Sequence, residues 1–361
     1  MTGTLGPSPA RRAHGDRTAG EVARDAGVST AAVELVWSSE VVDLHLESFI
    51  PPRLWGYDLH RRHEIGFPFY GCLFGHVDFP RALEGGLTGA MWSIATNVVQ
   101  PRSTRARHLA ENARALARAI DAHPGMRVVR THAEWLAARA EGLHAGLVCV
   151  QGGNAFEGAP LANPDGLVTR VTVVHLSNSV YGDTSSPARV GKDRGLTGRG
   201  EELVRWLDAE RIFVDLAHAG PETFWTAVRA HDRSLPLIAT HTGASAVHPM
   251  WRNLDDAQVK AIADTGGVVG VIAQRGFLGR GVRDGRVLID HLEAFQRAGG
   301  EGCAAIGTDF DGFIVPPPDV RDAATTYYRL VEYMLERRWS EQRIAGVLGA
   351  NFLRSFAALR P

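Results

Sequence analysis

Eight short runs of β-branched and other apolar residues recur along the chain, separated by longer stretches with apolar residues at helical spacing. Runs that are hydrophobic throughout are typical of parallel strands buried on both faces, and the stretches between them supply the helical crossovers that parallel pairing requires. The runs cover residues 40–46, 87–95, 146–151, 168–175, 211–218, 235–241, 267–273 and 303–310. Eight such units predict an α/β fold, a closed (β/α)₈ TIM barrel.

Two segments lie outside this series. A ninth, weaker run at 126–131 predicts an insertion between the second and third barrel strands. The first twenty residues are rich in Gly, Pro, Arg and Thr without periodicity and predict a loose arm, and residues 19–39 predict one or two short helices. We therefore expect an N-terminal segment over 1–39 and a single barrel domain over 40–361.

The charge balance and the cysteine content exclude several classes of protein. The 361 residues include 39 basic and 40 acidic side chains, so a nucleic acid or other polyanion is not an expected partner. Cys72, Cys149 and Cys303 are too few and too scattered for a disulfide framework and indicate a reducing compartment. The chain shows neither a signal-peptide pattern nor an apolar run of membrane-spanning length, so we expect a cytoplasmic protein without a membrane partner.

Polar side chains concentrate where the predicted strands end. In a TIM barrel these ends open onto one shared mouth, where catalytic residues lie. Imidazole and carboxylate groups at different strand ends have the lone pairs that a borderline-soft divalent cation such as Zn²⁺ prefers. The residues at these ends are His45, Glu47, Gln151, His175, His218, His241, Asp309 and Asp311.

The set is more informative than any of its members. A single histidine at a strand end has an ordinary explanation as a hydrogen-bonded core residue. Four separate strands that end in histidine, with D-x-D-G at the end of the last strand, would need several unrelated coincidences under that explanation. The pattern therefore predicts a metal site or a former one. Asp215, three residues before His218, is expected beneath the mouth as a partner of a ligand, and Asp43 has the same two possible roles of partner and ligand.

The motifs at these ends resemble those of the membrane (renal) dipeptidases, peptidase family M19, a branch of the amidohydrolase superfamily of binuclear zinc enzymes. The resemblance extends over roughly residues 40–357, and the order of its pieces makes it specific. The pieces are QGGNAF, VVHLSNSVYGD, GLTGRGEELVRWLDAERIFVDLAH, ATHTGASAVHPMWRNLDD, IGTDFDG and RRWSEQRIAGVLGANFLRSF. The resemblance implies that a metal-activated water hydrolyses a small amide such as a dipeptide.

The resemblance also implies a ligand set. It places His45 and Glu47, the acid two positions later, on one zinc ion. It places His218 and His241 on the other zinc ion. Asp309 would complete the first site and shuttle a proton.

Two further residues would contact the substrate. His175 matches the family histidine that polarises the scissile carbonyl, and Arg252 matches the arginine that clamps the free carboxylate. A guanidinium fork suits that task because it can form two parallel charge-assisted hydrogen bonds. On spacing alone, Arg252 could equally be a surface residue paired with Asp255 or Asp256. Asp311 would shuttle the proton only if the second acid of the DFDG motif, and not the first, matches the family aspartate. It fits better as a residue that orients the metal ligands.

Two positions depart from the family pattern. The first-strand motif of the family is H-x-D, whereas here Glu47 follows His45 and has about 1.5 Å more reach. The family has a bridging glutamate at the end of the third strand, where this chain has Gln151. An amide offers one neutral oxygen and an NH₂ group that repels a metal. Two cations a few ångströms apart need negative charge between them, so the second ion should bind more weakly.

Three outcomes follow from these departures. Glu47 could replace the missing bridge and keep two zinc ions; a single zinc could bind His218 and His241 with Asp309 or Glu47; or the site could be empty. We expect metal binding to survive and the binuclear arrangement to be lost, which favours one Zn²⁺ over two.

Three functions are compatible with this reading. The first is a zinc-dependent dipeptidase whose partner is a small substrate with a free carboxylate. The second is a mononuclear hydrolase of another amide, a lactam or an ester, because a shared fold does not fix the substrate. The third is a catalytically impaired homologue that binds a carboxylate, which Gln151 favours and the retention of the other site residues opposes. The family tends to dimerise, so a homodimer is possible.

Overall fold

The computed structural model describes residues 6–47, 49–64, 73–96, 100–188 and 191–361. Every strand pairing in this part of the chain is parallel. The strands are β1 (Val42–Leu46), β2 (Gly89–Ala95), β3 (Met126–Val128), β4 (His144–Gln151), β5 (Val168–Thr172), β6 (Phe213–Asp215), β7 (Ile238–Thr242), β8 (Val268–Val271) and β9 (Ala304–Ile306).

Eight of the nine strands close into a barrel. The strand order is β2-β1-β9-β8-β7-β6-β5-β4-β3, and a further pairing between β2 and β4 closes the ring. The predicted TIM barrel is therefore confirmed. β3 pairs only with the beginning of β4, before β5 takes over the same edge, so the ninth run is an insertion as predicted.

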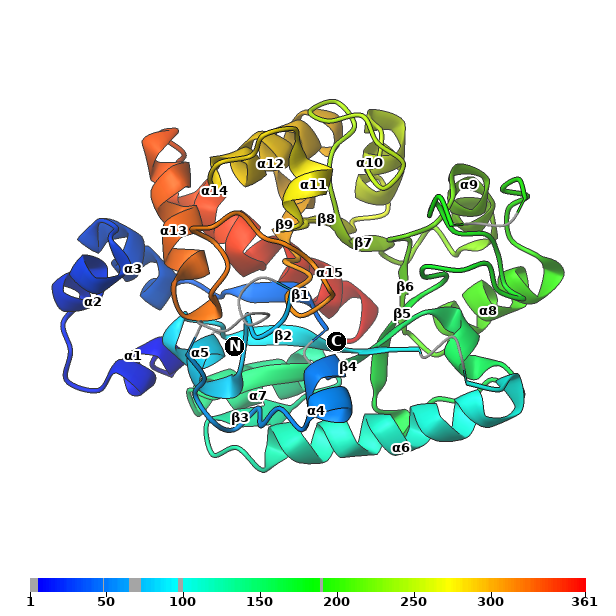
Figure 1. Ribbon diagram of the computed structural model, residues 1–361, viewed down its shortest axis with the longest axis horizontal. Helices are drawn as coiled ribbons and strands as arrows, with labels where there is room; N and C mark the ends of the chain where they lie inside the picture. The colour runs from blue at the N-terminus through cyan, green and yellow to red at the C-terminus, as the bar shows by residue number, and fades with distance from the viewer. Residues whose placement is uncertain (1–5, 48, 65–72, 97–99, 189–190) are drawn as a thin grey trace.

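Helices surround the barrel, with α6 along one side, α8 and α9 at one end and α10, α12 and α13 on the opposite side (Figure 1). The helical stretches that separate the predicted strands form α6, α8, α9, α10 and α12. The helices are α1 (Pro9–His14), α2 (Ala19–Ala26), α3 (Thr30–Ser38), α4 (Ile50–Trp55), α5 (Phe79–Glu84), α6 (Arg102–Asp121), α7 (His132–Ala140), α8 (Gly198–Ala209), α9 (Pro221–Ala230), α10 (Asp256–Ala263), α11 (Arg275–Leu278), α12 (Arg286–Gly299), α13 (Ala323–Glu336), α14 (Glu341–Ala345) and α15 (Asn351–Leu359). Three 3₁₀ turns, η1 (Gly153–Phe156), η2 (Pro164–Gly166) and η3 (Glu301–Cys303), and one π-helical turn, η4 (Gly346–Ala350), complete the set.

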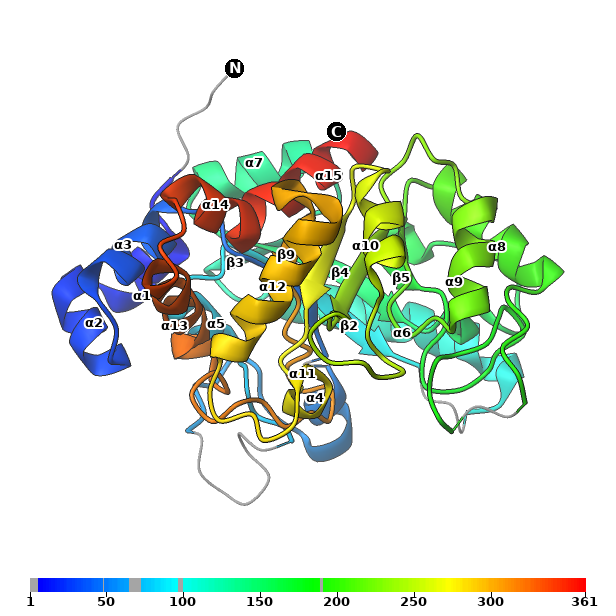
Figure 2. The same ribbon diagram turned by 90° about the horizontal axis from the view of Figure 1, so that it is seen from above.

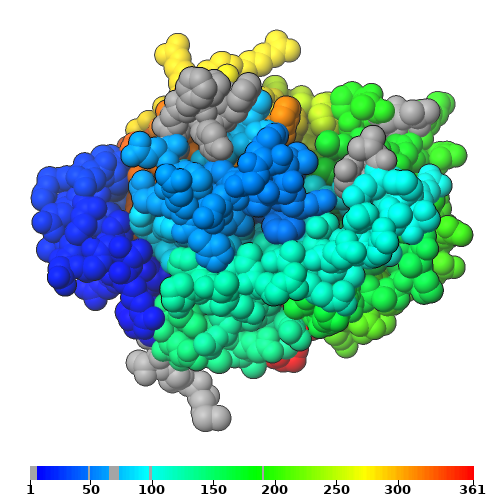
Figure 3. Space-filling model, turned by 60° about the horizontal axis from the view of Figure 1, so that its bottom comes forward, coloured from blue at the N-terminus to red at the C-terminus, as the bar shows by residue number. Residues whose placement is uncertain are grey.

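The N-terminal segment is more ordered than the sequence suggested. The expectation of a loose arm is wrong for α1, where the Ser8 hydroxyl accepts a hydrogen bond from the Ala10 amide and Ala10 is fully buried. Upstream, the Gly6 amide donates to the Arg139 carbonyl. The predicted short helices are α2 and α3, and α3 packs against α13. Figure 3 shows this dark-blue segment against the side of the barrel. Its apolar residues are too few to give a helical period in the sequence, but they are still buried.

The carboxyl ends of the strands lie on one side of the barrel. In Figure 2, α4 and α11, which follow β1 and β8, lie on this side, and the C-terminal helix α15 lies on the opposite side. Four strands end earlier than predicted, β5 at Thr172, β6 at Asp215, β8 at Val271 and β9 at Ile306. His218 and Asp309 each lie three residues past a strand end with φ of 67° and 62°, left-handed values that interrupt strand pairing. Such strain is commonly retained at functional sites.

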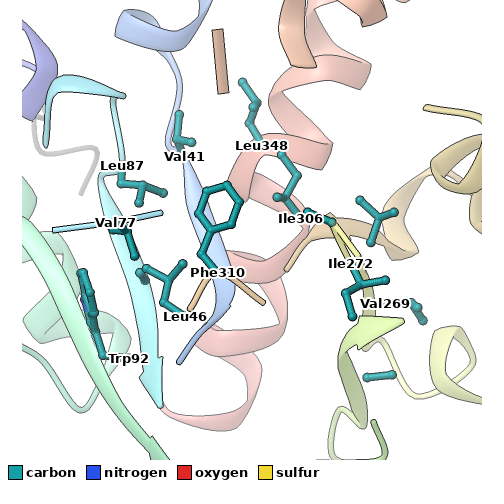
Figure 4. Close-up of a cluster of buried hydrophobic side chains, with 14 of the residues drawn as sticks. Val41, Leu46, Val77, Leu87, Trp92, Val269, Ile272, Ile306, Phe310 and Leu348 are labelled. Carbon is teal, nitrogen blue, oxygen red and sulfur yellow. The ribbon is translucent and has the colours of Figure 1, made fainter. Parts of the chain in front are cut away.

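A hydrophobic cluster anchors the loop that follows β9. Phe310 is fully buried and lies among Leu46, Ile306 and Val41 (Figure 4). The chain on either side of Phe310, which carries two acidic residues, is thereby held in place.

Two remaining expectations concern cysteines and membranes. Cys149 and Cys303 are buried free thiols, and Cys72 lies outside the described residues. No helix in the described part of the chain is both long enough and apolar enough to cross a bilayer. The cytoplasmic location stays a prediction.

Close packing beneath the mouth gives a first prediction. A Cβ added to Gly270 of β8 would lie 2.0 Å from the Thr240 carbonyl oxygen, a backbone atom that cannot move away cheaply. We expect Gly270→Ala to lower the free energy of unfolding by about 3 kcal/mol, at the upper end for overpacking, as measured by urea denaturation. Gly276→Ala is the control, because nothing lies within 4 Å of the added carbon. Equal stability of the two variants would contradict the packing described.

Candidate metal centre

Three buried residues bring possible ligand atoms together at the mouth. Ligand atoms of His45, His241 and Asp309 all lie within 4.8 Å of one another. His45 comes from β1 and His241 from β7, and Asp309 lies just past β9. The two imidazole rings are 3.8 Å apart between centroids, and His45 Nε2 lies 3.5 Å from Asp309 Oδ1. Residues distant in sequence thus converge on one buried point, with a donor set that suits a divalent cation.

The other three predicted ligands border this group. His218 Nε2 lies 2.9 Å from His241 Nε2. The Gln151 Nε2 atom lies 3.2 Å from His218 Nε2 and 3.3 Å from His241 Nε2. Glu47 Oε1 lies 3.3 Å from His45 Nε2. All six predicted metal-binding residues therefore lie in one cluster.

Several polar atoms of the cluster lack a hydrogen-bond partner although they are buried. They are His45 Nε2, His218 Nδ1 and both carboxylate oxygens of Glu47. Unpartnered buried polar atoms are costly and call for an explanation such as an ion. The Nε2 atoms of His218 and His241, the Glu47 oxygens and the carboxylate of Asp309 offer nitrogen and anionic oxygen donors, so the residues present fit a bound divalent cation.

The pKa shifts in the cluster also indicate a cation site. Burial raises the pKa of Glu47 to about 8. Burial, followed by the neighbouring Glu47 carboxyl, raises the pKa of Asp309 well above its ordinary value. Burial also lowers the pKa values of His218 and His241 far below the ordinary value. Without a cation, the acids tend toward their neutral forms, and a bound cation would favour the ionised carboxylates and neutral imidazoles that ligate metals.

His241 is oriented from below by a chain of hydrogen bonds. The Thr240 hydroxyl donates to Asp215 Oδ2 at 2.8 Å and lies 2.8 Å from His241 Nδ1. Since the single hydroxyl proton is given to Asp215, Thr240 accepts from Nδ1–H of His241. The lone pair of His241 is thereby left on Nε2, which faces the cluster, as expected of a metal ligand supported by a carboxylate. Asp215 therefore lies beneath the mouth, as predicted.

Asp43 also lies beneath the mouth and reaches no ligand atom of the cluster. It accepts hydrogen bonds from the His45 amide, from the Thr308 amide and hydroxyl, and from the Tyr327 hydroxyl. Burial raises its pKa to about 6. Asp43 thus joins β1 to the segment after β9 and sets the spacing between His45 and Asp309.

The two predicted substrate-contacting residues lie beside the cluster. Arg252 is buried, and its Nη2 donates to the His241 carbonyl at 2.6 Å while Nε has no hydrogen-bond partner. The alternative of a surface arginine is therefore wrong; Asp255 instead caps α10 by accepting from the Gln258 amide. Burial lowers the pKa of Arg252 to about 10, so it stays charged near neutral pH.

His175 and Asp311 occupy different surroundings. His175 is partly exposed, and its ring lies 4.7 Å from that of His218 in an edge-on arrangement. Burial, followed by the Arg252 charge, lowers the pKa of His175. Asp311 faces away from the cluster toward a buried partner, with Oδ1 3.0 Å from His76 Nδ1. Its predicted alternative role as proton shuttle therefore has no geometric support.

Arg170 belongs to the site and was missed in the sequence. It lies in β5, is fully buried, and its Nη2 lies 2.9 Å from His45 Nδ1. A signal was present, because a charged residue inside the apolar run VTRVTVVH requires a buried partner.

The sequence pattern of the membrane dipeptidases (peptidase family M19) matches residues 31–360. The chain therefore belongs to this family. A relative from Klebsiella pneumoniae, an uncharacterized protein in the pqqA 5′ region, is 34% identical over 175 residues, which cover 47% of this chain and 63% of that protein. The match thus spans less than two thirds of the relative's length.

Solved structures are similar over most of the chain. The dipeptidase AC, a metallopeptidase, is 25% identical with a TM-score of 0.73, over 89% of this chain and 99% of that one. A metallopeptidase from Rhodobacter sphaeroides, liganded with a phosphinate mimic of the dipeptide L-Ala-D-Ala, is 24% identical with a TM-score of 0.72, over 88% and 98%. The probable dipeptidase PvdM from Pseudomonas aeruginosa is 17% identical with a TM-score of 0.76, over 94% and 98%, and shares the fold.

Proposed function

We propose that this protein is a metal-dependent hydrolase that cleaves a small amide with a free carboxylate, such as a dipeptide. The observation that carries the proposal is the convergence of His45, His241 and Asp309 on one buried point at the barrel mouth, in a chain of the M19 family. The cofactor we propose is one Zn²⁺ held by His218 and His241, with Asp309 or Glu47. When bound, the ion supplies Lewis-acid activation of water and of the scissile carbonyl.

The residues of the cluster would handle the protons. With a cation bound, the Asp309 carboxylate would be ionised and could take a proton from the attacking water and return it to the leaving amine. The left-handed backbone at Asp309 and the buried anchor Phe310 keep that carboxyl group facing the cluster. A fixed position matters because proton transfer requires hydrogen-bond reach.

Two residues would position the substrate. The Arg252 guanidinium, with its unpartnered Nε, offers hydrogen-bond donors for the free carboxylate. His175, partly exposed beside His218, would donate to the carbonyl oxygen as negative charge develops there. The ligand of the Rhodobacter sphaeroides relative, a dipeptide mimic, supports a dipeptide as the substrate class.

A second candidate is a hydrolase of another amide, a lactam or an ester. Gln151 favours it. Its neutral amide contacts His218 and His241 where the family has a glutamate, so the cluster has less negative charge. A change in the charge of the site changes which transition state it stabilises. A homodimer stays a prediction. Hydrolysis of a panel of dipeptides with added Zn²⁺, followed by ninhydrin detection of released amino acids, separates the candidates: turnover supports the first, and no turnover of any dipeptide contradicts it.

Restoring a carboxylate at Gln151 gives a second prediction. We expect Gln151→Glu to raise the zinc content from about one to about two equivalents per chain, because an anion between two cations offsets their repulsion. Metal analysis after equilibrium dialysis measures this directly. Gln258→Glu, which changes a capping residue on α10, is the matched control and should leave the metal content unchanged. A Gln151→Glu variant that retains only one equivalent would show that the amide does not limit the metal count.

A further inference from the structure

Arg170 lies beneath the histidine–carboxylate cluster and contacts it through His45. Its Nη1 donates to the Val150 carbonyl and to the Thr172 hydroxyl, and it lies 3.4 Å from Asp215 Oδ2. Its Nη2 donates to the Ser93 hydroxyl and lies 2.9 Å from His45 Nδ1. The guanidinium is therefore fixed from both sides.

This contact determines the tautomer of His45. A guanidinium has donors and no acceptor, so at 2.9 Å the Nδ1 atom of His45 must be the acceptor. The proton of a neutral ring is then on Nε2. That nitrogen lies 3.3 Å from Glu47 Oε1 and 3.5 Å from Asp309 Oδ1. The N–H group of His45 thus faces two carboxyl groups at the position where a metal ligand would present a lone pair.

His241 has the opposite arrangement. Its Nδ1–H donates to Thr240, so its Nε2 lone pair faces the cluster. His45 and His241 are therefore prepared for different tasks, His45 to present an N–H group and His241 to bind a cation.

We propose that Arg170 holds His45 in the tautomer with its proton on Nε2, so that His45 presents an N–H group toward the carboxylates of the site and does not ligate the cation. The proposal rests on the proposed function, in that a cation occupies the cluster. It makes Arg170 a positioning residue and explains why the cluster would take one ion on the side of His241.

Nuclear magnetic resonance of protein labelled with ¹⁵N at histidine tests the tautomer. Long-range ¹H–¹⁵N correlations distinguish a protonated ring nitrogen from one with a lone pair, and a His45→Gln variant assigns the His45 signals. We expect His45 to carry its proton on Nε2 before and after addition of Zn²⁺, and His241 to carry its proton on Nδ1. A His45 ring protonated on Nδ1, or a His45 Nε2 signal shifted by bound zinc, would overturn the proposal.

Removal of the arginine tests the consequence. In Arg170→Met, the Ser93 hydroxyl, 3.4 Å from His45 Nδ1, can accept from Nδ1–H and free the Nε2 lone pair for the cation. We expect Zn²⁺ to bind about tenfold more tightly than to the wild type, as measured by competition with a chelating dye. Arg139→Met is the matched control, because it removes a buried arginine that pairs with Glu40 outside the cluster. Equal affinities of the two variants would refute the proposal.

The variant is expected to fold, because Asp215 keeps donors from the Ala217 and Thr240 amides and from the Thr172 and Thr240 hydroxyls. If it does not fold, the tautomer measured in the wild type decides. Neither measurement requires turnover. A protein that hydrolyses no dipeptide but shows the expected tautomers would contradict the proposed function and support the role of Arg170.

Discussion

Replacement of Asp309 by asparagine is expected to lower kcat for a dipeptide by about 10³-fold, within the range for loss of a general acid or base. Asparagine keeps the shape of the side chain and removes the group that can take and return a proton. It also removes one anionic oxygen from a cluster whose ligand atoms lie within 4.8 Å of one another. Steady-state kinetics at saturating Zn²⁺ separate the proton-transfer defect from weaker metal binding.

Asp311→Asn is the matched control for this experiment. Asp311 lies two residues further along the same loop, carries the same carboxyl group, and contacts His76. We expect its loss to affect stability more than turnover and to leave kcat within about tenfold of the wild type, since it takes no part in proton transfer. A large fall in kcat for Asp311→Asn with little effect of Asp309→Asn would reverse the assignment.

The second large effect is expected from Arg252→Met. Two charge-assisted hydrogen bonds to a substrate carboxylate, each worth roughly 1.5–3 kcal/mol, correspond to a fall in kcat/KM of about 10²-fold to 10⁴-fold. Arg252 is buried beside His241, and its Nε has no hydrogen-bond partner within the protein. Measurement of kcat/KM for a dipeptide in the wild type and the variant gives the effect.

The same dipeptide with an amidated C-terminus is the internal control, because it offers no carboxylate to Arg252. We expect the variant to lose the preference for the free acid and to cleave the amide about as well as the wild type does. A variant that cleaves both substrates equally poorly would instead indicate that Arg252 mainly supports the fold near the His241 carbonyl.

Much of the fold could be predicted because the spacing of apolar residues along the chain indicates which segments are buried. The continuous apolar runs predicted all eight barrel strands, and even the insertion at β3 followed from a run that did not fit the series. The strand ends were less predictable. His218 and Asp309 adopt left-handed backbone conformations, which His and Asp adopt more often than most residues but too rarely for the residue type to predict them. Helix α1 was missed because six residues are too few to show a helical period.

The site was predictable in part for a different reason. Histidines and acids at strand ends are visible as residue types, so all six predicted ligands could be named before their contacts were known. Their supporting contacts depend on which strands become neighbours. The bond from Thr240 of β7 to Asp215 of β6, and the contact of Arg170 of β5 with His45 of β1, form only when the chain has closed into the barrel. Such hydrogen bonds between strands leave no pattern of their own along the chain.

Dialysis of the purified protein against Zn²⁺ at neutral pH, followed by metal analysis, measures how many ions the histidine–carboxylate cluster retains. We predict one equivalent per chain in the wild type and loss of that equivalent in His241→Ala, with the circular dichroism spectrum unchanged. Retention of no zinc by the wild type, or retention of the same amount by His241→Ala, would contradict the conclusion that these residues converge to bind a cation.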